Sequence, residues 1–239
     1  MSNRIVLLAF IAAMGIGARA DESGRLRAVP FVFVGDAGDC GPAPGSNIVT
    51  SAWLRGMGLP DNGPMNTTAL ERDPHSGLLL NKNGPTADCS SAGARIRGAE
   101  GLRVGPLPHA AFVLGFDYRN STHCGAGSPR FNVRVRGSDT THFVGGCANG
   151  VAGPAPQDPA EWTRVRFANI AAAAFPPIPA DSTIESITLI VDEGTDAPSL
   201  EDPRGVGLSV VDNIFVNGRT IRSGTGIAPR GGSGRDDDD

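Results

Sequence analysis

The sequence lacks most of the features that identify common protein classes. Its 239 residues carry a formal net charge of only −4, and the absence of a strongly basic segment argues against a nucleic-acid partner. After residue 20, no run approaches the ~18 consecutive apolar residues that a membrane-spanning helix needs. The GxSxG, HExxH and SxxK motifs of several hydrolase classes are also missing. The sequence therefore favours no enzyme class and leaves an enzymatic role undecided.

Aromatic side chains are scarce, whereas turn-forming residues are abundant. Phe, Trp and Tyr make up 5% of the chain, which has 33 Gly and 19 Pro. An interior Gly costs a helix roughly 1 kcal/mol and an interior Pro about 3, so long helices are disfavoured. Disorder is disfavoured too, because 40% of the residues are hydrophobic and the net charge is small. The composition predicts a globular, all-β chain with many loops.

The two ends of the chain differ from its middle. Arg4 precedes an apolar run over 5–16, and small residues occupy positions 18 and 20, a pattern typical of a secretory signal peptide over 1–20. We therefore expect a secreted, extracellular protein. Residues 227–239 are rich in Gly and finish with four Asp, which predicts a disordered tail. Residues 21–226 remain for a single domain.

Alternating apolar and polar residues predict about ten β-strands. In the clearest case, residues 130–136, Phe131, Val133 and Val135 share one face of the strand. The predicted strands cover 29–34, 47–54, 77–80, 94–97, 110–118, 130–136, 141–146, 162–170, 184–192 and 207–216. This number of strands in one domain predicts a β-sandwich of the jelly-roll type.

Four cysteines follow the predicted leader. In an exported protein, an even number of cysteines is most simply explained by disulfides, here two. Four cysteines allow three connectivities, and we favour Cys40–Cys89 and Cys124–Cys147, because the second pair flanks one predicted hairpin. No CxxC motif or Cys/His spacing indicates that these residues bind a metal.

An acidic loop suggests a site for a hard cation. Asp192, Glu193 and Asp196 lie at and after the end of a predicted strand, and the segment 201–203 adds two more acidic residues. Ca²⁺ binds about six to eight oxygen ligands, which carboxylates and backbone carbonyls of such loops can supply. The alternative is a solvated turn whose side chains accept local backbone hydrogen bonds. A structural Ca²⁺ and a plain turn therefore stay open as two interpretations.

Two predicted strands carry polar or amphipathic side chains opposite their apolar residues. These side chains are Arg130, Asn132 and Arg134 on one strand, and Trp162, Arg164 and Arg166 on the other. A sheet face with arginine, asparagine and tryptophan can stack a sugar ring and hydrogen-bond its hydroxyl or acidic groups. The alternative is a solvated outer face, on which arginine is common.

The last two predicted strands carry a resemblance to a known class of module. The segments IESITLIVDEG (184–194) and GLSVVDNIFVNG (207–218) resemble the closing strands of secreted jelly-roll modules of the galactose-binding-like and carbohydrate-binding-module kind. In several such modules the acidic residue after an apolar pair ligates a structural calcium, so the resemblance implies that role for Asp212. The resemblance covers only these C-terminal strands, and a shared fold alone does not establish a function.

Together these features predict a secreted, non-catalytic binding module whose partner is an extracellular polysaccharide or glycan. An extracellular structural or surface-assembly protein is one alternative, with the acidic tail as a tether. A secreted glycan hydrolase is another, because the two carboxylates that such an enzyme needs come together in space rather than in sequence.

Overall fold

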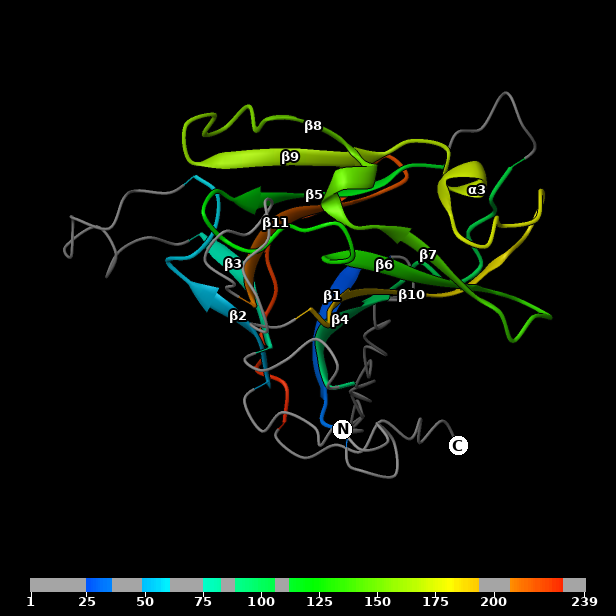
Figure 1. Cartoon of the computed structure of the whole chain (residues 1–239), viewed down its shortest axis with the longest axis horizontal. Coiled ribbons are helices and arrows are strands. Elements are labelled where there is room, and N and C mark those ends of the chain that lie inside the picture. The colour runs from blue at the N-terminus through cyan, green and yellow to red at the C-terminus, as the bar shows by residue number, and fades with distance from the viewer. Residues whose placement is uncertain are drawn as a thin grey trace, which may run out of the picture.

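A computed structural model describes residues 25–35, 49–60, 75–82, 89–105, 112–193 and 207–229 (Figure 1). The predicted signal peptide and residues 230–239 lie outside this part of the chain. Within the described residues, the helical elements are the short η2 (Cys147–Asn149) and α3 (Ile170–Ala173). No helix within the described ranges is long and apolar enough to cross a membrane.

The strands form two antiparallel sheets. The five-stranded sheet has the order β1-β4-β10-β6-β7, and the seven-stranded sheet has the order β2-β3-β11-β5-β9-β8, with β12 beside β11. The strands of the first sheet are β1 (Arg27–Phe33), β4 (Ser91–Arg97), β10 (Ile184–Val191), β6 (Arg130–Val135) and β7 (Thr141–Gly145). The strands of the second are β2 (Val49–Arg55), β3 (Ser76–Lys82), β11 (Leu208–Val216), β5 (Leu114–Arg119), β9 (Trp162–Phe167), β8 (Val151–Pro154) and β12 (Arg219–Ile221). The predicted all-β class and β-sandwich are confirmed.

Every predicted strand segment overlaps a strand of the structure. The structure adds β8 and β12, which are too short, at four and three residues, to show an alternating pattern. β12 follows β11 through Asn217 and Gly218, whose φ angles are 44° and 88°. Asn-Gly is a typical two-residue hairpin turn, because both residues tolerate this left-handed region. That dipeptide was the sequence signal for β12.

The core lies between the sheets, and three phenylalanines stand at its centre. Phe116 on β5, Phe131 on β6 and Phe167 on β9 have ring centroids 6.0 to 6.3 Å apart, and all three are buried. Since Phe131 belongs to one sheet and the other two to its partner, this cluster joins the sheets. Trp53 of β2 adds a second link, because its indole N–H donates to the Ala28 carbonyl of β1 at 2.8 Å.

The chain stays attached to the sandwich beyond the predicted boundary at residue 226. Ile227 forms an antiparallel bridge with Ala52 of β2, and the Ala228 amide donates to the Ser51 carbonyl at 2.8 Å. The Ala228 side chain is buried. The folded domain therefore extends at least to residue 228. An attachment this short leaves no periodic pattern in the sequence.

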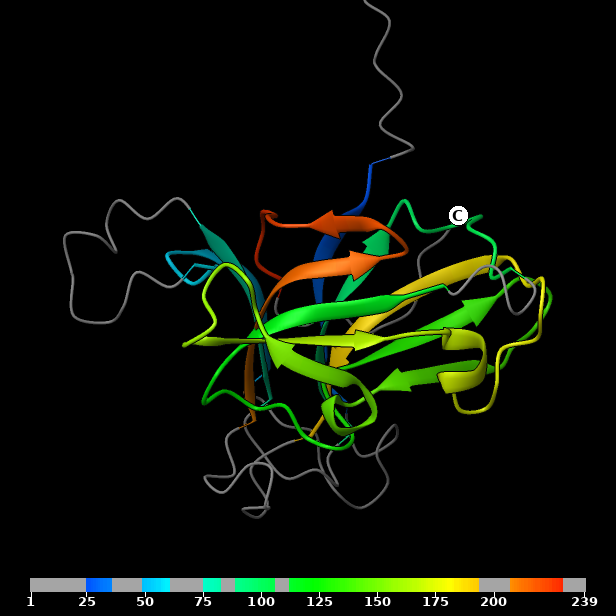
Figure 2. The ribbon, with the colours of Figure 1, turned by 90° about the horizontal axis from the view of Figure 1, so that it is seen from above.

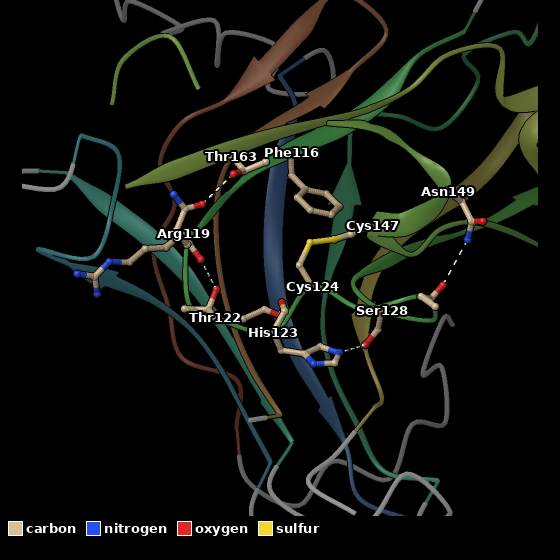
Figure 3. The surroundings of a disulfide bond; sticks show 12 residues. Phe116, Arg119, Thr122, His123, Cys124, Ser128, Cys147, Asn149 and Thr163 are labelled. Carbon is tan, nitrogen blue, oxygen red and sulfur yellow. Dashed lines mark hydrogen bonds between the residues drawn. A yellow bond between two sulfur atoms is a disulfide. The ribbon is translucent and has the colours of Figure 1, made fainter. Parts of the chain in front are cut away.

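The disulfide between Cys124 and Cys147 is present, with the two Cα atoms 5.5 Å apart (Figure 3). It joins the loop before β6 to the η2 turn after β7, in agreement with the predicted pairing. No cysteine among the described residues is free. Cys40 lies outside these residues, so the Cys40–Cys89 pairing stays a prediction.

Replacing Cys124 and Cys147 together by serine is expected to lower the free energy of unfolding by about 3 kcal/mol. The bond closes a loop with a sequence separation of 23, and opening it increases the conformational entropy of the unfolded chain. Urea unfolding of the variant and the parent protein measures the difference. An unchanged unfolding midpoint would show that this disulfide does not stabilise the sandwich.

Candidate functional site

The six residues predicted to form a ligand-binding face lie on two different sheets. Arg130, Asn132 and Arg134 are on β6 of the five-stranded sheet, whereas Trp162, Arg164 and Arg166 are on β9 of the seven-stranded sheet. The apolar residues of both strands point into the shared core, so the opposite faces look outward on opposite sides of the sandwich. A single face that combines both groups is therefore excluded.

On the seven-stranded sheet, Trp162 is covered and offers no ring to a ligand. Its side chain is fully buried in a cluster with Leu59, Ala155 and Val210. Leu59 comes from the segment 56–60, which is far from β9 in the sequence. The structure thus corrects the predicted stacking role of Trp162, because its ring is part of a small second core.

Arg164 and Arg166 are held by a buried carboxylate on the same sheet. Arg164 Nε and Nη2 donate to the two oxygens of Asp117 at 2.9 and 3.0 Å, and Arg166 Nη1 donates to Asp117 Oδ1 at 3.2 Å. The guanidinium carbon of Arg166 also lies 4.9 Å from the centroid of Phe215. Because Asp117 is fully buried, these contacts compensate for its desolvation. Both arginines therefore neutralise the buried Asp117 carboxylate, and their guanidinium groups are not displayed on an open surface.

A β-bulge places Asp212 and Asn213 together on the outer side of this sheet. The pairing of β11 with β5 shifts register after Asp212, and Asn213 has a φ of 46°. Val211 and Ile214, on either side, both point into the core, so the extra residue leaves two polar side chains facing outward. Asn213 Nδ2 donates to Asp117 Oδ2 at 2.8 Å, which connects the bulge to the arginine pair.

Asp212 is a buried carboxyl group whose two oxygens both bind backbone N–H groups. It is 2% exposed, and its oxygens accept hydrogen bonds from the backbone N–H groups of Leu59 at 2.9 Å and Asn213 at 2.6 Å. Burial raises the pKa of Asp212 to about 7; the two N–H donors oppose this rise, and the charge of Asp117 adds to it. The role of Asp212 as a calcium ligand, which the resemblance implies, stays a prediction.

The other predicted calcium ligands within the described ranges have protein partners. Asp192 accepts hydrogen bonds from both terminal nitrogens of Arg130. Glu193 Oε2 lies 2.8 Å from His123 Nε2, and this hydrogen bond lowers the pKa of the Glu193 carboxyl. No group of three or more His, Cys, Asp or Glu in the described part of the chain could hold a metal. Asp196 lies outside that part, so the calcium site stays a prediction.

Ser128 completes a group with the residue types of a hydrolase triad but not its geometry. Ser128 Oγ lies 3.2 Å from His123 Nε2 (Figure 3), the same nitrogen that contacts Glu193. In a catalytic triad, the nucleophile and the acid bind opposite nitrogens of the imidazole. Ser128 is also fully buried. These contacts tie the loop before β6 to the end of β10 and form no nucleophilic site.

Among the described residues, no segment packs over the outer face of the five-stranded sheet, which carries an aligned row of side chains. The strand registers align Val29, Arg95, Thr188, Asn132 and Phe143 across all five strands. Val29 is 44% exposed and Phe143 is 39% exposed, whereas Arg95, Thr188 and Asn132 are half-buried. With strands ~4.8 Å apart, the row is roughly 19 Å long. Such a row can contact several units of an extended ligand.

A second row lies beside the first and adds an aromatic ring at its other end. In the same strand order it consists of Phe31, Gly93, Ile190, Arg130 and Gly145. A Cβ atom on Gly93 would be 2.6 Å from the Phe31 ring, so this glycine lets the ring lie close against the sheet. The guanidinium carbon of Arg95 lies 5.4 Å from the centroid of that ring. Phe31 and Phe143 thus stand on the two edge strands, each beside an arginine.

Arg130 positions its neighbours on this face. Its guanidinium carbon lies 5.2 Å from the centroid of Phe143, and its Nε donates to the Asn132 side-chain carbonyl at 3.2 Å. Its terminal nitrogens bind Asp192. This bond fixes the orientation of the Asn132 amide, whose nitrogen can donate to a ligand.

Arg134 lies on the same open face, in line with Ser186 and Thr141. Its Nη2 is 3.6 Å from Asp139 Oδ1, and 41% of its side chain is exposed. The prediction for β6 thus identified three residues of an open face. It missed Phe31, Arg95, Thr188 and Phe143, because their place beside β6 depends on long-range strand pairing.

Comparison of the chain with protein-family models, curated proteins and solved structures finds no match.

The stability of the sandwich is expected to fall as the pH rises from about 4 to 7. The pKa of Asp212 is about 7 in the folded protein and 3.8 in its ordinary state, so the folded protein binds the proton more tightly across this window. Between pH 5 and pH 8 this group alone removes about 2–3 kcal/mol of stability. Urea unfolding at both pH values measures the change.

The matched variants are Asp212→Asn, which cannot ionise, and Asp139→Asn at an exposed position. The loss of stability between pH 5 and pH 8 should shrink by the predicted amount only in Asp212→Asn. If this variant keeps the full pH dependence of the parent protein, Asp212 is not the responsible group.

Proposed function

We propose that the protein is a secreted, non-catalytic module that binds extracellular carbohydrate through the outer face of the five-stranded sheet. The observation that carries this proposal is the pair of rows on that face, with Phe31 and Phe143 at opposite edges and Thr188 and Asn132 between them. Secretion is supported by the leader-like sequence at 1–20.

The chemistry of the face suits a sugar better than an apolar ligand. The phenylalanine rings supply apolar surface against which the C–H side of a sugar ring packs. The Thr188 hydroxyl can donate and accept hydrogen bonds, and the Asn132 amide nitrogen can donate them, as sugar hydroxyls require. Arg95 adds a charged donor beside Phe31. A face with rings at its two edges and hydrogen-bonding groups between them therefore offers contacts to both the apolar and the polar side of sugar rings.

The jelly-roll type is part of the same proposal. The chain passes repeatedly from one sheet to the other, from β4 to β5, back to β6, and again between β9, β10 and β11. This exchange is compatible with the antiparallel, double-sheet jelly roll that the C-terminal strands resemble. The acidic tail, on which the structural-protein alternative rests, lies outside the described residues, and that alternative stays a prediction.

The two buried carboxylates do not favour the hydrolase alternative. Asp117 and Asp212 are register partners on β5 and β11, one with a raised pKa and the other paired with arginine. Glycosidases use a pair of acids with divided roles. Here both side chains are buried, and Leu59 contacts Asp212 from the outer side, so neither acid is open to a glycosidic bond.

Affinity electrophoresis against a panel of neutral and acidic polysaccharides tests the proposal. We expect retardation by at least one polysaccharide, and the double variant Phe31→Ala, Phe143→Ala should lose it. Each ring removed is expected to weaken binding roughly tenfold, which corresponds to about 1.4 kcal/mol.

The matched control is Phe215→Ala, which removes another arginine-stacked phenylalanine, but from the seven-stranded sheet. This variant should be retarded like the parent protein. An absence of retardation by every polysaccharide, or an equal loss in the control, would count against a carbohydrate-binding role for this face.

A further inference from the structure

A basic groove lies at one corner of the sandwich, where β1 and the end of β4 approach β12 and the segment after it. Its volume is about 1060 Å³, and five arginines line it: Arg25, Arg27, Arg97, Arg219 and Arg222. All five are exposed. None of the described residues that line the groove is acidic. The described lining thus brings five basic side chains together in a chain whose net charge is negative.

Both sheets contribute to the groove, and specific contacts hold its walls together. Arg27 and Arg97 are register partners on β1 and β4 of the five-stranded sheet. From the seven-stranded sheet, Arg219 Nη2 donates to the Gly98 carbonyl at 3.3 Å. In Figure 2 the orange β11–β12 hairpin lies beside the blue β1. The fold thus gathers arginines from three distant parts of the sequence.

We infer that this groove binds the carboxylate or sulfate groups of an acidic polysaccharide. A guanidinium group presents its donors in a planar fork that matches such anions, and it stays charged at every physiological pH. Several like charges in one groove create a positive potential that attracts and stabilises an anionic ligand. The anionic character follows from the groove itself, whereas the identification of the ligand as a glycan rests on the proposed function.

The position of the groove favours a polymer over a single sugar acid. Arg27, Val29 and Arg97 line the groove and also lie on the outer face of the five-stranded sheet, where Val29 begins the first row. A chain that lies along this row from β7 to β1 therefore continues into the groove. The sheet face then contacts neutral parts of the sugar rings, and the groove contacts the acidic groups of the same polymer.

The inference is tested by titrating the protein with dextran sulfate, oligogalacturonate and unmodified dextran at low and high ionic strength. We expect both anionic probes to bind at least about tenfold more tightly than dextran, and high salt to weaken only their binding. The probe that binds more tightly identifies the anionic group. The double variant Arg97→Gln, Arg222→Gln should weaken binding of the anionic probes about tenfold or more.

The control is the double variant Arg103→Gln, Arg136→Gln, which removes the same charge from exposed positions outside the groove. It should bind the anionic probes within about twofold of the parent protein. Equal losses in the two double variants, or equal binding of dextran and the anionic probes, would overturn the inference.

Two further outcomes separate the ligand classes. If polyglutamate binds as tightly as the acidic polysaccharides, the groove is an anion-binding site but the assignment of its ligand as a glycan is wrong. Retardation that depends on Phe31 and Phe143 but not on the groove would overturn this inference and leave the proposed function intact.

Discussion

The apolar packing between the two sheets decides where most polar side chains of the described strands lie. Phe116, Phe131 and Phe167 contact one another across the interface, and each strand must turn its apolar side toward them. Since successive residues of a strand point to opposite faces, this constraint also determines which residues point outward. The rows on the five-stranded sheet, the arginine–aspartate cluster on the other sheet and the corner groove all follow from it.

The local pattern of the sequence was sufficient for the positions of most strands and for their inward faces. Alternation over 130–136 placed Phe131 in the core and Arg130 and Asn132 outside, and the structure has the same arrangement. Local alternation contains no information about which strands pair. β6 and β9 therefore looked like parts of one face, although β6 pairs with β10 and β7, and β9 pairs with β5 and β8.

The two outer faces differ because only one of them has a covering segment among the described residues. The alternating pattern of β9 correctly predicted that Trp162 faces away from the main core. In the structure, Leu59 packs on the Trp162 ring, and the two residues belong to a second small core. The same cover reaches Asp212 through the Leu59 amide, and the bulge that turns Asp212 and Asn213 outward has no signature in the sequence. The polar pair Asp212 and Asn213 thus lies in a buried hydrogen-bonding network.

On the outer face of the five-stranded sheet, charged side chains are distributed unevenly between the β7 edge and the β1 edge. Arg130 is neutralised by Asp192 near the β7 edge, whereas the arginines at the β1 edge line a groove to which the described chain contributes no acid. Among the described residues, arginine side chains are therefore concentrated at the β1 end of the rows, where the groove lies. An acidic polymer gains most when its charged groups lie at the β1 end, while a neutral sugar has no such preference. In the proposed binding mode, the arginines at the β1 end would bind the acidic groups and so orient the polymer across the sheet.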